Sequence, residues 1–272
     1  MHSKQKTAAF LQVMVQLTGC FCAVLLAVCL ALQLTLLKEG HYAGSLEKSG
    51  YLGYVQQVLE QNCGNLAAEA GLSAQPVQAQ ITPEAVRAGV LHRADALWRG
   101  PTEDETDPFG TLDDAYAADP ESDQTEVLAL QMACEQEWHA DTVIPFSAAL
   151  AVVLQYQKVV LFAAWFCTVL LAGCCAVQFL LAANWAEVRA GFANIAFGSL
   201  AAGIALALGI YFAADWQHWM PDSDPAYAAF CRWFAAFPVV IPVCSAAIAL
   251  ALWAAGRIMQ KQIKPKAPRQ KE

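Results

Sequence analysis

The chain has 272 residues, of which 57% are hydrophobic and 15% are charged, and its formal net charge is −8. Soluble domains carry roughly 25% charged and about 45–50% apolar residues, so this composition excludes an ordinary water-soluble globular protein. The apolar residues gather in four long runs and the charges lie between these runs, which is typical of a protein that crosses a membrane several times.

The first apolar run extends over about residues 7–37, and its start resembles a lipoprotein signal. Lys4 and Lys6 precede a short apolar stretch that ends in the Leu-Thr-Gly-Cys sequence of residues 17–20. The apolar region of such a signal is only about 7–15 residues long, and polar chain follows the cleavage site. Here the apolar run continues well past Cys20. We therefore expect an uncleaved first membrane span, with a lipidated Cys20 as the alternative.

Residues 38–145, which follow the first span, are predicted to form a small helical domain. In the first predicted helix, Ser49 is the N-terminal cap and Gly64 ends the helix, and the apolar residues between them recur on one face. In the second, Thr82 is the cap and Gly100 the stop signal.

A third helix is predicted from about Thr125, and Pro145 should break or kink it before the second span. Residues 101–124, between the second and third helices, are rich in acidic residues and contain Pro and Gly. This stretch lacks the Asp-x-Asp-x-Asp-Gly order of a calcium loop. We therefore expect a mobile, solvated surface loop rather than a cation site.

Two of the ten cysteines, Cys63 and Cys134, lie in the predicted helical domain, and we expect them to form a disulfide. This bridge would close about 70 residues and add on the order of 4 kcal/mol to the stability of the domain. The oxidising side of a membrane permits such a bridge. The alternative is two buried free thiols, and Cys231 is a further cysteine that competes for pairing. The cysteines inside the spans are expected to act as small apolar side chains.

Three more apolar runs follow, each long enough to cross roughly 30 Å of hydrocarbon as a helix and each without a charge in its middle. The predicted fold class is therefore all-α, a polytopic membrane protein with four transmembrane helices and a small extracytoplasmic helical domain. The predicted parts are residues 1–37 (N-terminus and first span), 38–145 (helical domain), 146–256 (spans at about 159–181, 191–214 and 234–256) and 257–272 (basic tail).

The positive charges predict the orientation, because Lys and Arg near span ends are retained in the cytoplasm. They cluster before the first span, at Arg189 between the second and third spans, and in the tail. Residues 38–158 instead contain 19 acidic residues against six Lys and Arg. We therefore expect a plasma-membrane protein with both termini in the cytoplasm. The tail either anchors this topology or also binds the anionic inner leaflet, through Arg257, Lys261, Lys264, Lys266, Arg269 and Lys271.

Polar and small residues in the spans predict contacts between helices. Gln178 and Asn194 are expected to hydrogen-bond between the second and third spans, and a substrate path is the alternative. The third span carries small residues at the spacing that lets helices approach closely. The sequence leaves open whether the partner helix belongs to this chain or to another copy. These small residues are Gly198, Ser199, Ala202 and Gly203.

Two stretches carry a resemblance to known sequences: KSGYLGYVQQVLEQN at residues 48–62 and ITPEAVRAGVLHRADALW at residues 81–98. With the order of the spans, they make the chain similar to a group of uncharacterised Gram-positive bacterial membrane proteins. These share an N-terminal span, an outer helical domain that begins with a Ser-Gly-Tyr stretch, and three further spans. The resemblance implies this topology and a bacterial host, and it implies no activity.

Motifs of known catalytic chemistry are absent from the sequence, and Cys134, Glu135 and His139 on one predicted helix are too few for a zinc site. We therefore expect no metal and no cofactor. The favoured hypothesis is a non-enzymatic protein that binds or senses an envelope ligand through its outer helical domain, or assists another membrane protein. A transporter or channel subunit is the alternative, and a membrane enzyme ranks third. The expected partners are the bilayer, an extracytoplasmic ligand and a membrane protein or second copy of the chain, without nucleic acid.

Overall fold

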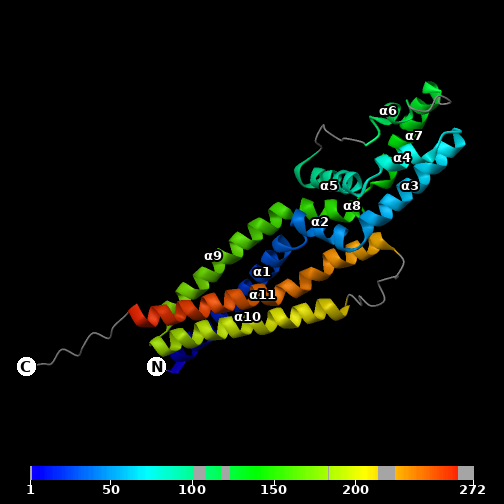
Figure 1. The fold of residues 1–272 in the computed structure, drawn as a ribbon. Helices are drawn as coiled ribbons and strands as arrows, with labels where there is room; N and C mark the ends of the chain where they lie inside the picture. Colours follow the sequence, from blue (N-terminus) through cyan, green and yellow to red (C-terminus); the bar gives the residue numbers. More distant parts are fainter. Residues whose placement is uncertain (1, 101–107, 118–122, 183, 214–223, 263–272) are drawn as a thin grey trace, which may run out of the picture. The chain divides into compact units, whose positions relative to one another are not determined.

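The computed structural model describes residues 2–100, 108–117, 123–182, 184–213 and 224–262, and every regular element in these ranges is a helix (Figure 1). The chain divides into two compact units, each described here by itself. We call residues 1–37, 156–216 and 235–272 the span unit, and residues 38–155 and 217–234 the interspan unit.

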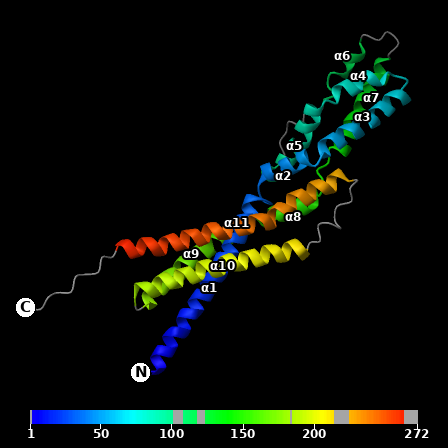
Figure 2. The same cartoon turned by 60° about the horizontal axis from the view of Figure 1, so that its bottom comes forward.

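Four helical stretches are long and apolar enough to cross a membrane, which confirms the predicted all-helical, multi-pass architecture. The helices that carry them in the span unit are α1 (His2–Leu34), α9 (Gln157–Leu181), α10 (Trp185–Ala213) and α11 (Pro225–Gln262). Three of the stretches begin earlier than predicted, at Ser147, Trp185 and Pro225. Figure 2 shows the same helices from a second direction.

The core of the span unit lies where these four helices meet, and small side chains make close packing possible there. Ala23 on α1, Ile195 on α10 and Leu252 on α11 belong to one buried cluster. Many apolar side chains outside this cluster are exposed to the surroundings; Phe162 and Leu180 on α9 are 72% and 78% exposed. A helix bundle with an apolar outer surface is what a hydrocarbon solvent requires.

The interspan unit consists of short helices that pack on one another and on the first turns of α11. In chain order they are α2 (Glu39–Lys48), α3 (Tyr51–Glu69), α4 (Ala74–Gln80), α5 (Pro83–Arg99), α6 (Leu112–Tyr116), α7 (Gln124–Asp141) and α8 (Ser147–Gln155).

Capping residues explain where several of these helices begin and end. Thr82 Oγ1 accepts a hydrogen bond from the Ala85 amide (3.2 Å), and α5 stops at Gly100, as the sequence predicts. The prediction for α3 is partly wrong. The chain enters α3 through Gly50, whose φ of 79° is in the left-handed region. The helix then continues through Gly64 to its last residue, Glu69.

Gly64 lies inside α3, where it has a packing role and does not end the helix. A Cβ built at this position would lie 2.8 Å from Gln78 Nε2 of α4, so a larger residue would displace the end of the Gln78 side chain. The short helices α2 and α4 were not predicted, since neither has enough residues to establish a period. Part of the predicted acidic loop also differs: α6 forms within it, and Leu112 and Tyr116 on this helix are buried. The rest of that loop, residues 101–107 and 118–122, lies outside the described residues.

Trp138 on α7 is the centre of the interspan core. It is 1% exposed, and its ring packs edge-on against Phe109 with 6.1 Å between ring centroids. A Cβ at Gly89 of α5 would lie only 2.5 Å from Trp138 Cζ2, so the indole fills the space that this glycine leaves. The buried stripe of α7 consists of Val127, Leu130, Cys134 and Trp138.

The segment between α7 and α8 is held by two buried tyrosines. The Tyr51 hydroxyl donates to the Val143 carbonyl (2.6 Å), and the Tyr42 hydroxyl donates to the Pro145 carbonyl (2.7 Å). Burial raises the pKa of Tyr51 to about 12, so this hydroxyl stays protonated and keeps donating. These bonds attach α2 and α3 to the turn that contains Pro145, where α7 has ended as predicted.

Candidate functional site

The two cysteines predicted to pair come together in the interspan core. Cys63 on α3 and Cys134 on α7 are both completely buried. Their thiols are hydrogen-bonded to each other, which is the main cause that raises the pKa of Cys63 and lowers that of Cys134. Both are free thiols in this structure, so the disulfide stays a prediction. Cys231 is buried on α11 and hydrogen-bonded with Tyr227.

The two polar residues predicted to link the second and third spans have other neighbours. Asn194 Nδ2 donates to Gln16 Oε1 on α1 at 3.1 Å. Gln178 is fully buried, and neither atom of its amide has a hydrogen-bond partner among the described residues. Its amide packs into the space left by Gly191 on α10. Gln178 and Asn194 therefore do not share the expected hydrogen bond. Asn194 bonds to α1 instead, and Gln178 packs against a glycine of α10.

Gly191→Ala is expected to destabilise the span unit by about 1–3 kcal/mol, because its Cβ would overlap the Gln178 amide in a packed interior. The measurement is denaturant unfolding of the purified protein in detergent. Adding Gln178→Ala should restore most of the loss. Gly209→Ala on the same helix is the matched control, since nothing lies within 4 Å of a Cβ there. Equal stability of the Gly191 and Gly209 variants would contradict the tight packing.

The small residues of α10 contact helices of the same chain at two places. A Cβ at Gly198 would lie 2.9 Å from Cys20 Sγ on α1, and a Cβ at Gly203 would overlap the Ser245 hydroxyl on α11. Ser199 is buried, and its hydroxyl donates to the Ala196 carbonyl (3.0 Å), whereas Ala202 is exposed.

The basic tail is described only at its start. The Arg257 guanidinium lies 4.9 Å from the centre of the Trp253 ring on the same helix. The side chain of Lys261 and residues 263–272, which include the other predicted cations, lie outside the described residues.

A pocket that the sequence did not predict lies in the interspan unit, between α2 and the first turns of α11. Its volume is about 280 Å³. Gly40 and Gly44 lie one turn apart on α2, and nothing lies within 4 Å of a Cβ at either position, which leaves this wall open. The residues that line the pocket are Gly40, His41, Gly44, Ser45, Lys48 and Arg232.

Hydrogen bonds fix the two walls of the pocket to each other. His41 Nε2 donates to the Trp233 carbonyl (3.1 Å), and Arg232 Nη1 donates to the Lys48 carbonyl (2.6 Å). Next to the residues that line the pocket, the buried Tyr42 ring of α2 packs edge-on against the Trp233 ring of α11, with 5.5 Å between ring centroids. The walls are therefore held by both polar and aromatic contacts.

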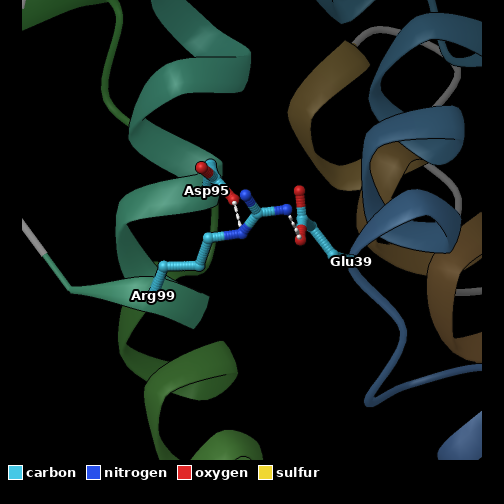
Figure 3. A network of polar contacts seen from close by, with 3 residues as sticks. All are labelled: Glu39, Asp95 and Arg99. Atoms are coloured by element: carbon cyan, nitrogen blue, oxygen red, sulfur yellow. Dashed lines mark hydrogen bonds and ion pairs between the residues drawn. The ribbon is translucent and has the colours of Figure 1, made fainter. Parts of the chain in front are cut away.

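The charges of α2 are separated between two of its faces. Glu47 is paired with Arg87 of α5 at 2.6 Å. Glu39 is paired with Arg99 of α5 at 3.5 Å, and Figure 3 shows Arg99 between Glu39 and Asp95, with Asp95 at 2.7 Å. The acidic residues of α2 thus belong to its contact with α5.

The pocket is left with positive charge. Within the described ranges, Lys48 and Arg232 have no carboxylate within ion-pair distance. Arg232 uses one N–H on the Lys48 carbonyl, and its other N–H groups and the Lys48 ammonium are free to donate. The small cavity is thus lined by two cations and by two glycines without side chains. This arrangement suits an oxyanion such as a phosphate group, because Arg and Lys form charge-assisted hydrogen bonds with phosphate oxygens.

Only the α2 side of this pocket has a recognisable pattern in the sequence. Gly40, Gly44 and Lys48 follow one another at intervals of four residues, which places them on one face of a helix. Arg232 comes from the far end of the chain and is brought to α2 by the tertiary structure alone.

Comparison of the chain with models of known protein families finds no match, and comparisons with curated proteins and with solved structures find none either.

Proposed function

We propose that this protein is a multi-pass plasma-membrane protein that binds a phosphate-bearing ligand at the cationic pocket of its interspan unit, on the extracytoplasmic side. The observation that carries the proposal is the pair of cations, Lys48 and Arg232, without carboxylate partners among the described residues of an otherwise acidic unit. The ligand is either the headgroup of a phospholipid or a free phosphate compound, since both present the same oxygens. Binding of this kind fits a sensing or accessory protein without catalysis.

Both walls of the pocket are close in sequence to membrane spans, which supports a ligand at the membrane surface. α2 begins at Glu39, five residues after α1 ends at Leu34, and Arg232 belongs to the helix that carries the fourth span. The proposed side of the membrane depends on the positive charges, which cluster at the termini and at Arg189. A reporter active only outside the cell should give no signal at either terminus.

The binding test uses the full chain in detergent, titrated with inorganic phosphate and, in a separate arm, with a short-chain phosphatidylglycerol. Arg232→Gln should weaken binding of the true ligand about 10- to 100-fold, because a hydrogen bond to a charged group contributes about 1.5–3 kcal/mol. Gly44→Leu keeps the charges and fills the pocket, so it should also block binding. Isothermal calorimetry measures both effects.

Lys38→Gln is the matched control, because it removes an exposed cation that lies outside the pocket. This variant should bind as the original chain does. Binding of phosphate alone identifies a free ligand, and binding of the lipid alone identifies a headgroup. The proposal is wrong if neither probe binds, or if Lys38→Gln and Arg232→Gln weaken binding equally.

A transporter or channel subunit is the second candidate, and one observation favours it: the unpartnered amide of Gln178 is buried between span helices. A polar group in a hydrocarbon environment is costly and is often part of a substrate path. The Gly191 contact supplies a packing role for this residue, and we therefore place ligand binding first.

A further inference from the structure

An apolar groove lies between α10 and α11 in the span unit, and its volume is about 330 Å³. Two close helix contacts bracket it along the helices, Gly203 against Ser245 and Gly256 against Phe192. The lining residues are Ala196, Phe197, Leu200, Ala246, Ala249, Leu250 and Trp253.

The groove exists because small and large side chains alternate around it. Ala196 and Ala249 are buried and form its base, while Phe197 and Trp253 stand out from the surface, 66% and 44% exposed. Such a groove opens toward the medium around the bundle, which is hydrocarbon for a helix that crosses a bilayer. A molecule that binds in this groove must therefore be apolar along the length that contacts these residues.

A cation lies beside the end of the groove that Trp253 forms. Arg257 follows Trp253 by one helical turn, and its guanidinium is 4.9 Å from the centre of the Trp253 ring. This cation–π contact orients the guanidinium, and its N–H groups stay available for phosphate oxygens. Within the described ranges, Arg257 has no ion pair with a carboxylate.

We propose that this groove binds one acyl chain of an anionic phospholipid and that Arg257 binds the phosphate of the same lipid. An apolar groove that ends at a fixed cation is complementary to a molecule with an apolar chain and an anionic head. The site is independent of the interspan pocket, because it uses different residues in the other unit.

Native mass spectrometry of the purified full chain tests the site with phosphatidylglycerol and phosphatidylcholine that carry the same acyl chains. The protein should prefer the anionic lipid. Arg257→Gln should reduce that preference about fivefold, the effect of one cation at a bilayer surface. Arg189→Gln is the matched control, since this exposed cation of α10 is absent from the groove, and it should keep the preference.

A second variant separates the groove from the charge. Ala246→Leu fills the groove and should lower binding of both lipids, whereas Ala201→Leu, at an exposed alanine of α10 outside the groove, should not. The proposal is overturned if Arg257→Gln keeps its lipid preference, or if Ala246→Leu and Ala201→Leu bind lipid equally. A photo-crosslinker at position 246 that joins two copies of the chain would also overturn it.

Discussion

Trp138→Ala is expected to lower the free energy of unfolding of the interspan unit by about 3–5 kcal/mol. Trp138 is 1% exposed, contacts Phe109 edge-on, and fills the space above Gly89. Its removal would take a large apolar side chain out of a small core and leave a cavity between α5 and α7. Domains of this size have a total stability of only about 5–15 kcal/mol, so much of it would be lost.

The measurement is denaturant unfolding of the full chain in detergent, followed by circular dichroism, with proteolysis of the interspan unit as a second readout. Met132→Ala is the matched control, because Met132 is on the same helix and is 64% exposed. That variant should change stability by at most about 0.5 kcal/mol. If Trp138→Ala and Met132→Ala unfold alike, the assignment of Trp138 to the centre of the core is wrong.

In protein isolated from the membrane, Cys63 and Cys134 are expected to be joined by a disulfide. The two buried thiols already contact each other, and the proposed topology places them on the oxidising side. The bridge should stabilise the interspan unit by about 4 kcal/mol, since it closes a long loop in the unfolded chain. Reduction of the unfolded protein, or Cys63→Ala with Cys134→Ala, should remove this stabilisation.

The state of the pair is measured by trapping free thiols under denaturing conditions without reductant, followed by mass spectrometry. Cys231→Ala is the control, and it should leave the bridge in place, because Cys231 is bonded to Tyr227 in the structure. Two labelled thiols at positions 63 and 134 would refute the disulfide. The same result would weaken the proposed topology, since reduced thiols are usual in the cytoplasm.

The sequence predicts the membrane-spanning helices because hydrophobic length alone decides them. The start of α5 is also predictable, since Thr82 satisfies a free amide at that end. Gly64 is different: a glycine ends a helix when it adopts a positive φ, as Gly50 and Gly71 do at 79° and 74°. Gly64 instead leaves space for the Gln78 amide, and this contact involves a neighbour that local sequence does not identify.

The candidate site was less predictable than the fold because its parts come from distant segments. The cationic pocket needs Arg232 beside Lys48, a contact between residues 184 positions apart. Asn194 likewise bonds to Gln16 of α1 rather than to the neighbouring span. Composition and spacing identified polar residues that contact other helices, but choosing their partners required the packed structure.

The complete burial of the Cys63 and Cys134 sulfurs limits when their oxidation state can change. An oxidant or a reductant reaches them only while α3 and α7 are apart, because neither residue has exposed surface once the helices have packed. The pair is therefore oxidised or left reduced before or during folding. After folding, the oxidation state of the pair indicates the compartment in which this part of the chain folded.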